Sequence, residues 1–426
     1  MNKELNRQKA PVYHQITKIN IPDIECGQLT NQVPYSILSG GSQELVYLEL
    51  KFNAGHTYAD VLVSTFTSAM LVCGTKHHSA KQIADTFDFY GAELRADSNS
   101  DHAILSLFCM NKYLDKLLPL FCEIVEESVF PENELQIMIA DKKNQFIVNH
   151  TKTSVLASDA MHKMVFGTHI YGRRAQLSDY DTINSDTLRK FYAKHYCAAN
   201  SQLLVAGYVT NDVMKSIDAT IGQLSAGQAV KPIIAPILPV SGDKTQIIKM
   251  GDAVQSSLRM GLATIKMDHP DYHKLHMLTM VLGGYFGSRL MTNIRKEKGY
   301  TYGIYSILFP QVQSGLLRIL GDIKSGFSSQ VADEVRKEMQ KLKDQPISND
   351  EMALVRNYMM GEMLQMFDGP FTSCDAVAKA IDMGVGMKYF EDEQNSILNT
   401  KPSELQEMAN KYFDLDNLAT AIAGNE

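Results

Sequence analysis

The chain carries one order of sequence patterns twice, and this duplication constrains its fold more than any other feature. In each copy a strand pattern leads to an apolar helix and a second helical segment, and then to a pair of strands and two further helices. The segments of the first copy are residues 44–55, 59–74, 79–91, 92–100, 101–110, 113–130 and 131–150. Those of the second are residues 256–267, 271–284, 288–299, 300–309, 315–323, 328–347 and 348–367. The repeated order predicts two similar units in one chain.

A segment near the middle of the chain separates the two copies. Residues 225–246 are rich in proline, glycine and small side chains, which is typical of a linker. Strands that occur as pairs of alternating polarity, followed by helices, favour an antiparallel sheet backed by helices. We therefore predict an α+β protein with two homologous domains, residues 1–224 and 247–426, joined by the linker 225–246.

Composition and charge exclude several classes of protein. Hydrophobic residues make up 45% and charged residues 21% of the 426 positions, which is typical of a folded globular chain. A net charge of −7 argues against a protein that coats nucleic acid. No run approaches the ~18–20 apolar residues of a membrane span, and the polar first 22 residues lack a signal-peptide core. Six scattered cysteines without a C-x-x-C pair indicate reduced thiols. The expectation is a cytoplasmic protein without nucleic-acid or membrane partners.

Two stretches carry a family resemblance. "CGTKHHSAKQIADTFDFYGAELRADSNS" at 73–100 and "GGYFGSRLMTNIRKEKGYTYGIYS" at 283–306 occur in the order and spacing of one family. The chain resembles the pitrilysin/insulinase-like metallopeptidases, and most of all the half-sized bacterial members similar to mitochondrial processing peptidase. The resemblance runs from about Cys26 to the end and includes the duplication. It implies the metallohydrolase fold of that family in both halves.

The zinc signature of the family is degenerate in this chain. The family carries H-x-x-E-H on the first helix, where two histidines bind Zn²⁺ on one helix face and the glutamate is the general base. The resemblance places Thr65 and Ala69 at the histidine positions, Ser68 at the base and Gln145 at the distal ligand. Hydroxyls, a methyl group and a neutral amide are poor or impossible Zn²⁺ ligands. We expect no catalytic residue and no zinc in this chain.

An arginine and a tyrosine of the second half match the family's substrate-holding pair. The resemblance implies that Arg295 and Tyr302 face a peptide across a closed chamber, Arg295 as a forked donor and Tyr302 as a single O–H donor. Considered without the family, Arg295 would make a surface ion pair and Tyr302 would pack on the core.

Histidine clusters in two segments invite a metal interpretation. His269, His273 and His276 have helical spacing, but Pro270 and Asp271 indicate an ordinary helix start and no third ligand is evident. His77 and His78 are predicted to be solvated in a loop.

The leading hypothesis is a non-catalytic, substrate-binding subunit of a heterodimeric zinc peptidase. A homologous H-x-x-E-H partner would carry the zinc, and an extended peptide would add to a sheet edge near residues 94–100. The alternatives are a structural subunit resembling the peptidase-derived core proteins of a respiratory complex, and a peptide-binding or chaperone-like module without hydrolysis. A partner that bears H-x-x-E-H would separate them.

Overall fold

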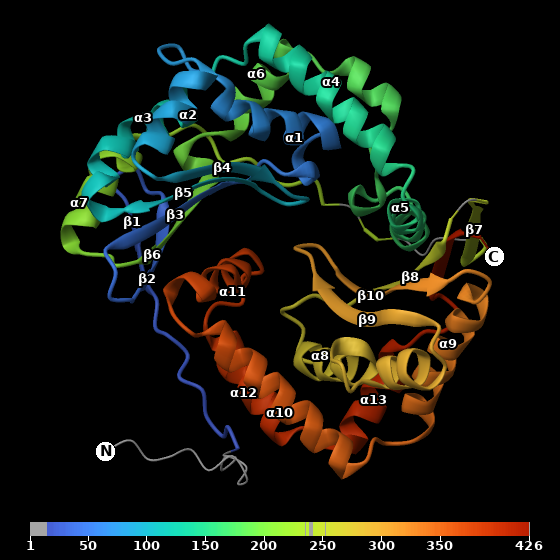
Figure 1. The fold of residues 1–426 in the computed structure, drawn as a ribbon. Helices are drawn as coiled ribbons and strands as arrows, with labels where there is room; N and C mark the ends of the chain where they lie inside the picture. The colour runs from blue at the N-terminus through green and yellow to red at the C-terminus, as the bar shows by residue number, and fades with distance from the viewer. Residues whose placement is uncertain (1–14, 235, 238–241, 252, 426) are drawn as a thin grey trace, which may run out of the picture.

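Two mixed layers of sheet and helix face one another in the computed structural model of the chain (Figure 1). The structure describes residues 15–234, 236–237, 242–251 and 253–425. The first sheet contains β1 (Glu25–Gln28), β2 (Pro34–Ser39), β3 (Leu45–Phe52), β4 (Glu93–Ser98), β5 (Ala103–Met110) and β6 (Ser201–Gly207). The second contains β7 (Thr245–Lys249), β8 (Gln255–Thr264), β9 (Thr301–Pro310), β10 (Gly315–Lys324) and β11 (Ala419–Gly424).

The two sheets have the same strand order. The first runs β1-β2-β6-β3-β5-β4 and the second β7-β11-β8-β10-β9, so the second repeats the first without β1. Each sheet is antiparallel except for one parallel pair, β2 with β6 and β7 with β11, which the predicted antiparallel sheets did not include. The α+β class and the duplication predicted from the sequence are confirmed.

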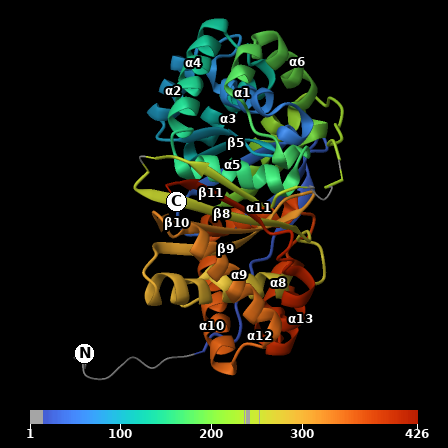
Figure 2. The same ribbon diagram turned by 90° about the vertical axis from the view of Figure 1, so that its right-hand side faces the viewer.

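Most helices of each half cover the outer face of its sheet. The first half has α1 (Val61–Met70), α2 (Ala80–Phe89), α3 (Leu114–Glu127), α4 (Glu132–Asn149), α5 (Thr153–Phe166), α6 (Ser185–His195) and α7 (Asn211–Thr220). The second half has α8 (Tyr272–Thr279), α9 (Ser328–Asp344), α10 (Asn349–Met366), α11 (Pro370–Asp382), α12 (Lys388–Asn399) and α13 (Pro402–Tyr412). Two π-helical segments, η8 (Met280–Gly284) and η9 (Met291–Glu297), follow α8. Figure 2 shows the two layered halves stacked, with α5 between them.

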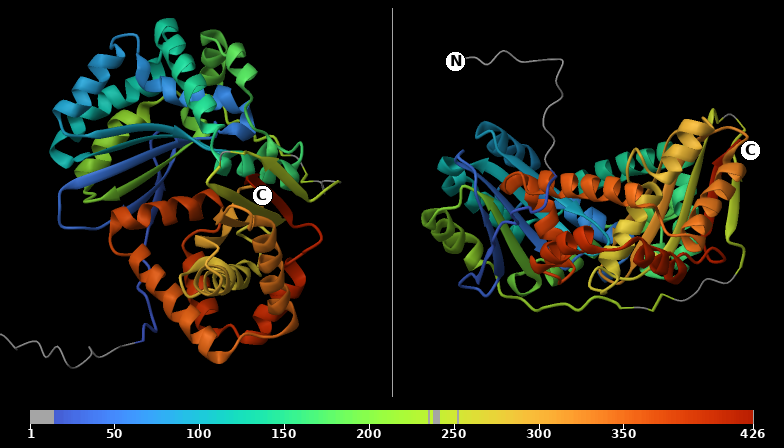
Figure 3. Two further views of the ribbon diagram at one scale, coloured as in Figure 1. Left: turned by 45° about the vertical axis from the view of Figure 1, so that its right-hand side comes forward. Right: turned by 90° about the horizontal axis from the view of Figure 1, so that it is seen from below.

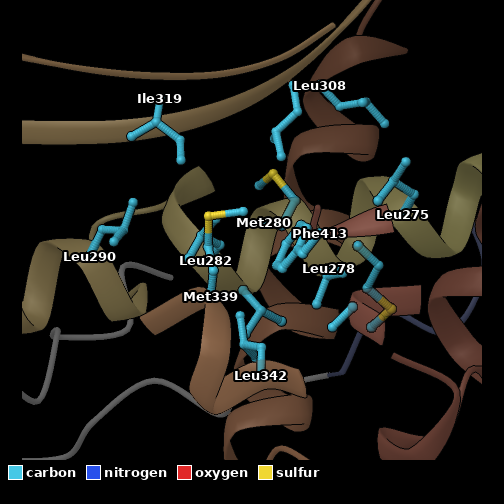
Figure 4. Close-up of a cluster of buried hydrophobic side chains, with 14 of the residues drawn as sticks. Leu275, Leu278, Met280, Leu282, Leu290, Leu308, Ile319, Met339, Leu342 and Phe413 are labelled. Atoms are coloured by element: carbon cyan, nitrogen blue, oxygen red, sulfur yellow. The ribbon is translucent and has the colours of Figure 1, made fainter. Parts of the chain in front are cut away.

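Strand periodicity accounts for how each sheet buries one face. Along β9 the even residues Ile304, Ser306 and Leu308 are buried, while the odd residues between them are exposed. Figure 4 shows Leu308 of β9 and Ile319 of β10 directed at leucines and methionines of α8, η8 and α9. A separate cluster of apolar residues fills the same space in the first half.

Two helices pack on the sheet of the other half. Helix α5 of the first half lies on β8 and β11, where Ala157 and Met161 belong to one buried cluster with Ala421 of β11. Helix α11 of the second half lies on β2 and β6, where Val377 packs with Leu38 and other apolar residues. These helices hold equivalent positions in the two copies, so the exchange is reciprocal. The division predicted from the sequence did not include it.

The connection between the halves runs along one side of the molecule (Figure 3, right). Within the predicted linker, positions 235 and 238–241 lie outside the described residues. Its earlier part is held to the first half, since the N–H groups of Ala198 and Ala199 donate to the carbonyls of Ser225 and Ala226. The Ile233 N–H donates to the Thr57 carbonyl.

Candidate functional site

The helix that carries the zinc signature in the resembling family is α1, and its hydroxyls are engaged in structural hydrogen bonds. The Thr65 hydroxyl donates to the Val61 carbonyl at 2.9 Å and lies 3.2 Å from His56 Nε2. Because its own proton is used, Thr65 Oγ1 accepts from His56. The buried Ser68 hydroxyl donates to the Asp97 carbonyl of β4 at 2.6 Å. These oxygens fix α1 against the sheet.

The other two signature positions offer no metal ligand. Ala69 has only a methyl group, and its carbonyl lies 3.7 Å from the Cys73 thiol that donates to it. Gln145 is exposed on α4, where its amide donates to Asp141 at 2.6 Å. These donors do not fit Zn²⁺, which prefers imidazole, thiolate and carboxylate. Across the described part of the chain, no group of three or more histidine, cysteine, aspartate or glutamate side chains is placed to hold a metal ion.

His56 beside Thr65 is a neutral imidazole. Burial, with a smaller contribution from the Arg174 charge, lowers the pKa of His56 to about 4. At neutral pH it can therefore donate the hydrogen bond to Thr65 without carrying charge. It stabilises the start of α1.

Arg295 and Tyr302 line one pocket. Its volume is about 1200 Å³, and it lies where the turn between α4 and α5 meets the β7–β8 turn and the ends of β9 and β10. Lys152 and Lys324 line it as well. Four side chains from distant segments thus give the pocket a cationic, hydrogen-bond-donating lining.

Neither Arg295 nor Tyr302 has the ordinary structural role that the sequence also allowed, a surface ion pair for Arg295 and core packing for Tyr302. The Arg295 guanidinium lies 4.6 Å from the ring centroid of Phe286, and no carboxylate among the described residues pairs with it. Tyr302 is 86% exposed and does not pack on the core. An unpaired arginine and an exposed phenol are free to contact a ligand.

Known families and structures match nearly all of this fold. A family model described as "Insulinase (Peptidase family M16)" matches residues 37–174, and one described as "Peptidase M16 inactive domain" matches residues 182–359. The chain belongs to peptidase family M16. It is a half-sized, pitrilysin-like member whose own zinc position is degenerate.

Curated relatives and solved structures agree with this membership. The uncharacterized zinc protease YmxG of Bacillus subtilis is 23% identical over 71% of this chain and 73% of its own. The non-peptidase homolog YmxG of Helicobacter pylori is 19% identical over 89% of each chain. The M16 inactive-domain structure from Pseudomonas fluorescens has a TM-score of 0.86 at 22% identity, over 95% of this chain and 98% of that one. Proteins named as peptidases and a protein named as a non-peptidase homolog are therefore both similar to this chain in sequence.

The histidines of α8 in this M16 chain are structural. The helix starts at Asp271 as predicted, although the Asp271 carboxylate accepts hydrogen bonds from Lys411 and Tyr412 rather than from the backbone of the helix. His276 Nδ1 lies 2.9 Å from Glu393 of α12, and His273 packs on the ring of Tyr389 at 4.4 Å. Burial alone would lower the pKa of His276, but the hydrogen bond and charge of Glu393 raise it.

The prediction that His77 and His78 are solvated in a loop holds for His77, which is exposed, whereas His78 is half-buried. Each histidine also lies beside a glutamate of α3. His78 Nδ1 is 2.8 Å from Glu123, and His77 Nε2 is 3.2 Å from Glu127. The two glutamates belong to α3, which lies more than 40 residues later in the sequence and contacts this loop only after folding.

Sequence reasoning missed Lys152 and Lys324. Lys152 is the last residue before α5, and Lys324 is the last residue of β10. In the sequence, each resembles an ordinary solvated lysine. Only the packing of α5 on the second sheet brings them to Arg295. No local pattern marks them.

No helix in the described ranges is long and apolar enough to cross a membrane.

Proposed function

We propose that this chain is the non-catalytic, peptide-holding subunit of a two-chain M16 peptidase. Its partner would be a homologous chain that bears H-x-x-E-H and supplies the zinc. The single observation that carries the proposal is the contrast between two sites. The hydroxyls at the metal positions are tied to backbone carbonyls. Arg295, by contrast, has no carboxylate partner among the described residues and lines an open cationic pocket with Tyr302.

The two pocket side chains suit an extended peptide. Arg295 can direct two parallel N–H groups at a carbonyl or carboxylate, and its stacking on Phe286 limits the freedom of the guanidinium. Tyr302, near the start of β9, adds an O–H donor. Together they would orient the peptide and stabilise charge on its carbonyl oxygen. Zinc chemistry would belong to the partner.

The predicted sheet edge for the peptide is compatible with this role. β4 is the outer strand of the first sheet, and β5 is its one partner among the described strands. An edge strand can add a further strand through its backbone N–H and C=O groups, and the residues of β4 are exposed or half-buried. The proposal places the peptide backbone there and the donors on the opposite half.

We also propose a cytoplasmic location, which the six cysteines support. All six are free thiols, and burial raises the pKa of Cys109, Cys122 and Cys374 to about 12. Such thiols are unreactive and typical of a reducing compartment. Cell fractionation followed by immunoblotting tests this location.

Affinity purification of the tagged full-length chain tests the main proposal. Mass spectrometry should identify a stoichiometric H-x-x-E-H homologue, and the purified complex should cleave unfolded peptides that neither chain cleaves alone. A complex that contains respiratory proteins would support the structural alternative. Recovery of the chain with peptides but without any peptidase would support the chaperone-like alternative.

A further inference from the structure

The two edge strands that occupy equivalent positions in the repeat present opposite chemistry. β4 exposes Glu93, Arg95 and Asp97 on the side away from its core. β9 exposes Tyr305, Ile307 and Phe309, which are 47%, 40% and 42% exposed. A monomer rarely leaves a row of large apolar side chains on an edge strand, because such edges aggregate. The apolar row therefore requires an explanation.

The apolar row lies on the inner face of the second sheet. The even residues of β9 point into the core beneath the sheet, so the odd residues point the other way. This is the face on which α5 packs, but α5 covers β8 and β11 rather than β9. Figure 1 shows this open part of β9 and β10 facing the first sheet across the interior of the molecule.

An arginine without an anion stands beside this row. Arg318 of β10 is directly opposite Ile307 in the register, and its guanidinium lies 4.4 Å from the ring centroid of Phe309. Its Nε–H is buried without a hydrogen-bond partner. No carboxylate of the described residues pairs with it, whereas the neighbouring Arg259 pairs with Asp322 at 3.2 Å.

The surroundings of Arg318 are cationic. Burial and the charge of Arg259 lower the pKa of Arg318, and its charge in turn helps to lower the pKa of His162 on α5. A half-buried cation that lacks a counter-ion is costly to the folded protein. A ligand carboxylate would remove that cost.

We propose that Tyr305, Ile307, Phe309 and Arg318, here named the β9 wall, select the peptides that this subunit holds. The selected class is an extended peptide with apolar side chains at alternate positions and a carboxylate beside them. Side chains two residues apart on a strand repeat every ~6.6–6.8 Å, and an extended ligand has the same repeat. The carboxylate would bind Arg318, supplied either by an acidic side chain or by the C-terminus of the peptide. This inference rests on the proposed peptide-holding role and deepens it.

Fluorescence anisotropy with the purified full-length chain tests the β9 wall without any partner. The probe is a short labelled peptide that alternates leucine with serine and carries one glutamate. Replacing its glutamate with glutamine should weaken binding about 10–100-fold, the range for losing one charge-assisted contact. If C-terminal amidation weakens binding instead, the carboxylate is that of the terminus. If neither change alters binding, the assignment of Arg318 is wrong.

Variants of the protein provide the second arm. Arg318→Gln should match the loss seen with the glutamine peptide, and Arg318→Lys should recover part of it. Ile307→Thr should weaken binding about 5–30-fold because an apolar contact is lost. Arg189→Gln on α6 and Ile137→Thr on α4 are matched controls, since both side chains are exposed on the outer helices. Equal effects of the controls and the wall variants would overturn the inference.

The two proposals fail separately. A chain that binds acidic, apolar peptides through Arg318 and Ile307 but has no peptidase partner would retain the β9 wall and refute the heterodimer. A heterodimer whose activity depends on Arg295, but whose peptide binding is unchanged by Arg318→Gln, would retain the heterodimer proposal and refute the β9 wall.

Discussion

Lys51 of the first sheet and Asp382 at the end of α11 form an ion pair across the two halves, with Nζ and Oδ2 2.7 Å apart. Only 6% of the Lys51 side chain and 13% of the Asp382 side chain are exposed. Gln202 of β6 donates to the other Asp382 oxygen at 2.8 Å. The pair fastens the exchanged helix α11 to the sheet on which it lies.

Removing one partner of this pair should destabilise the protein. Asp382→Asn leaves the buried Lys51 with one carboxylate partner, Glu49 at 3.1 Å, so the free energy of unfolding should fall by about 1–3 kcal/mol. Urea denaturation measures the change. Asp375→Asn on the same helix is the control, because Asp375 is exposed and should alter stability little. Equal losses from both variants would contradict the role of the pair.

The packing of α5 on the second sheet depends on a residue without a side chain. A Cβ on Gly261 of β8 would lie 2.3 Å from Met161 Sδ and 3.1 Å from Val165 Cγ2. Gly261→Val should therefore lower the free energy of unfolding by about 1–3 kcal/mol through overpacking. Gly361→Val on α10, where a Cβ meets nothing, should not. Thermal unfolding of both variants distinguishes them.

His56 should make the protein sensitive to acid. Its pKa is lowered to about 4 in the folded chain, against about 6.5 when unfolded, so the unfolded chain takes up a proton that the folded chain resists. Stability should thus decline as pH falls from about 6.5 to 4, by up to ~1.4 kcal/mol per pH unit from this group. His56→Gln keeps a donor for Thr65 and should flatten that part of the curve. A parallel pH profile for the variant would show that His56 does not contribute.

The chain should not hold zinc. With Thr65, Ala69 and Gln145 at the ligand positions, the purified protein should contain no stoichiometric metal and should cleave no peptide alone. Elemental analysis after purification in zinc-containing buffer measures this. A tightly held zinc that is lost on mutating residues 65–69 would refute it.

Arg295 and Tyr302 should govern peptide cleavage by the heterodimer. Arg295→Ala and Tyr302→Phe should each leave the complex assembled and lower kcat/KM by about 10–1,000-fold. Arg295→Lys should recover part of the activity, because an ammonium cannot reproduce the forked donors. Steady-state kinetics with matched complex concentrations give the comparison. Unchanged cleavage by both variants would assign the pair a structural role.

The elements of the repeat could be predicted from the sequence because local periodicity specifies them. The predicted strand at 44–55 and helix at 131–150 correspond to β3 and α4, and the strand at 300–309 corresponds to β9. The central strands β6 and β11 were not marked. They lie at the ends of the two copies, and their partners in the sheet are distant in sequence. The degenerate signature was likewise visible, because ligand chemistry depends on residue type.

The sequence by itself determined two similar α+β units and the absence of zinc ligands at the signature positions. The tertiary structure alone decided that α5 and α11 exchange sheets and that Lys152 and Lys324 join Arg295. It also decided that Arg318 lies beside Phe309 with no carboxylate from the described part of the chain. The physical reason is that an apolar face in a helix pattern predicts burial but does not identify the surface that will bury it. Which sheet buries it depends on contacts between residues hundreds of positions apart, and no local pattern contains them.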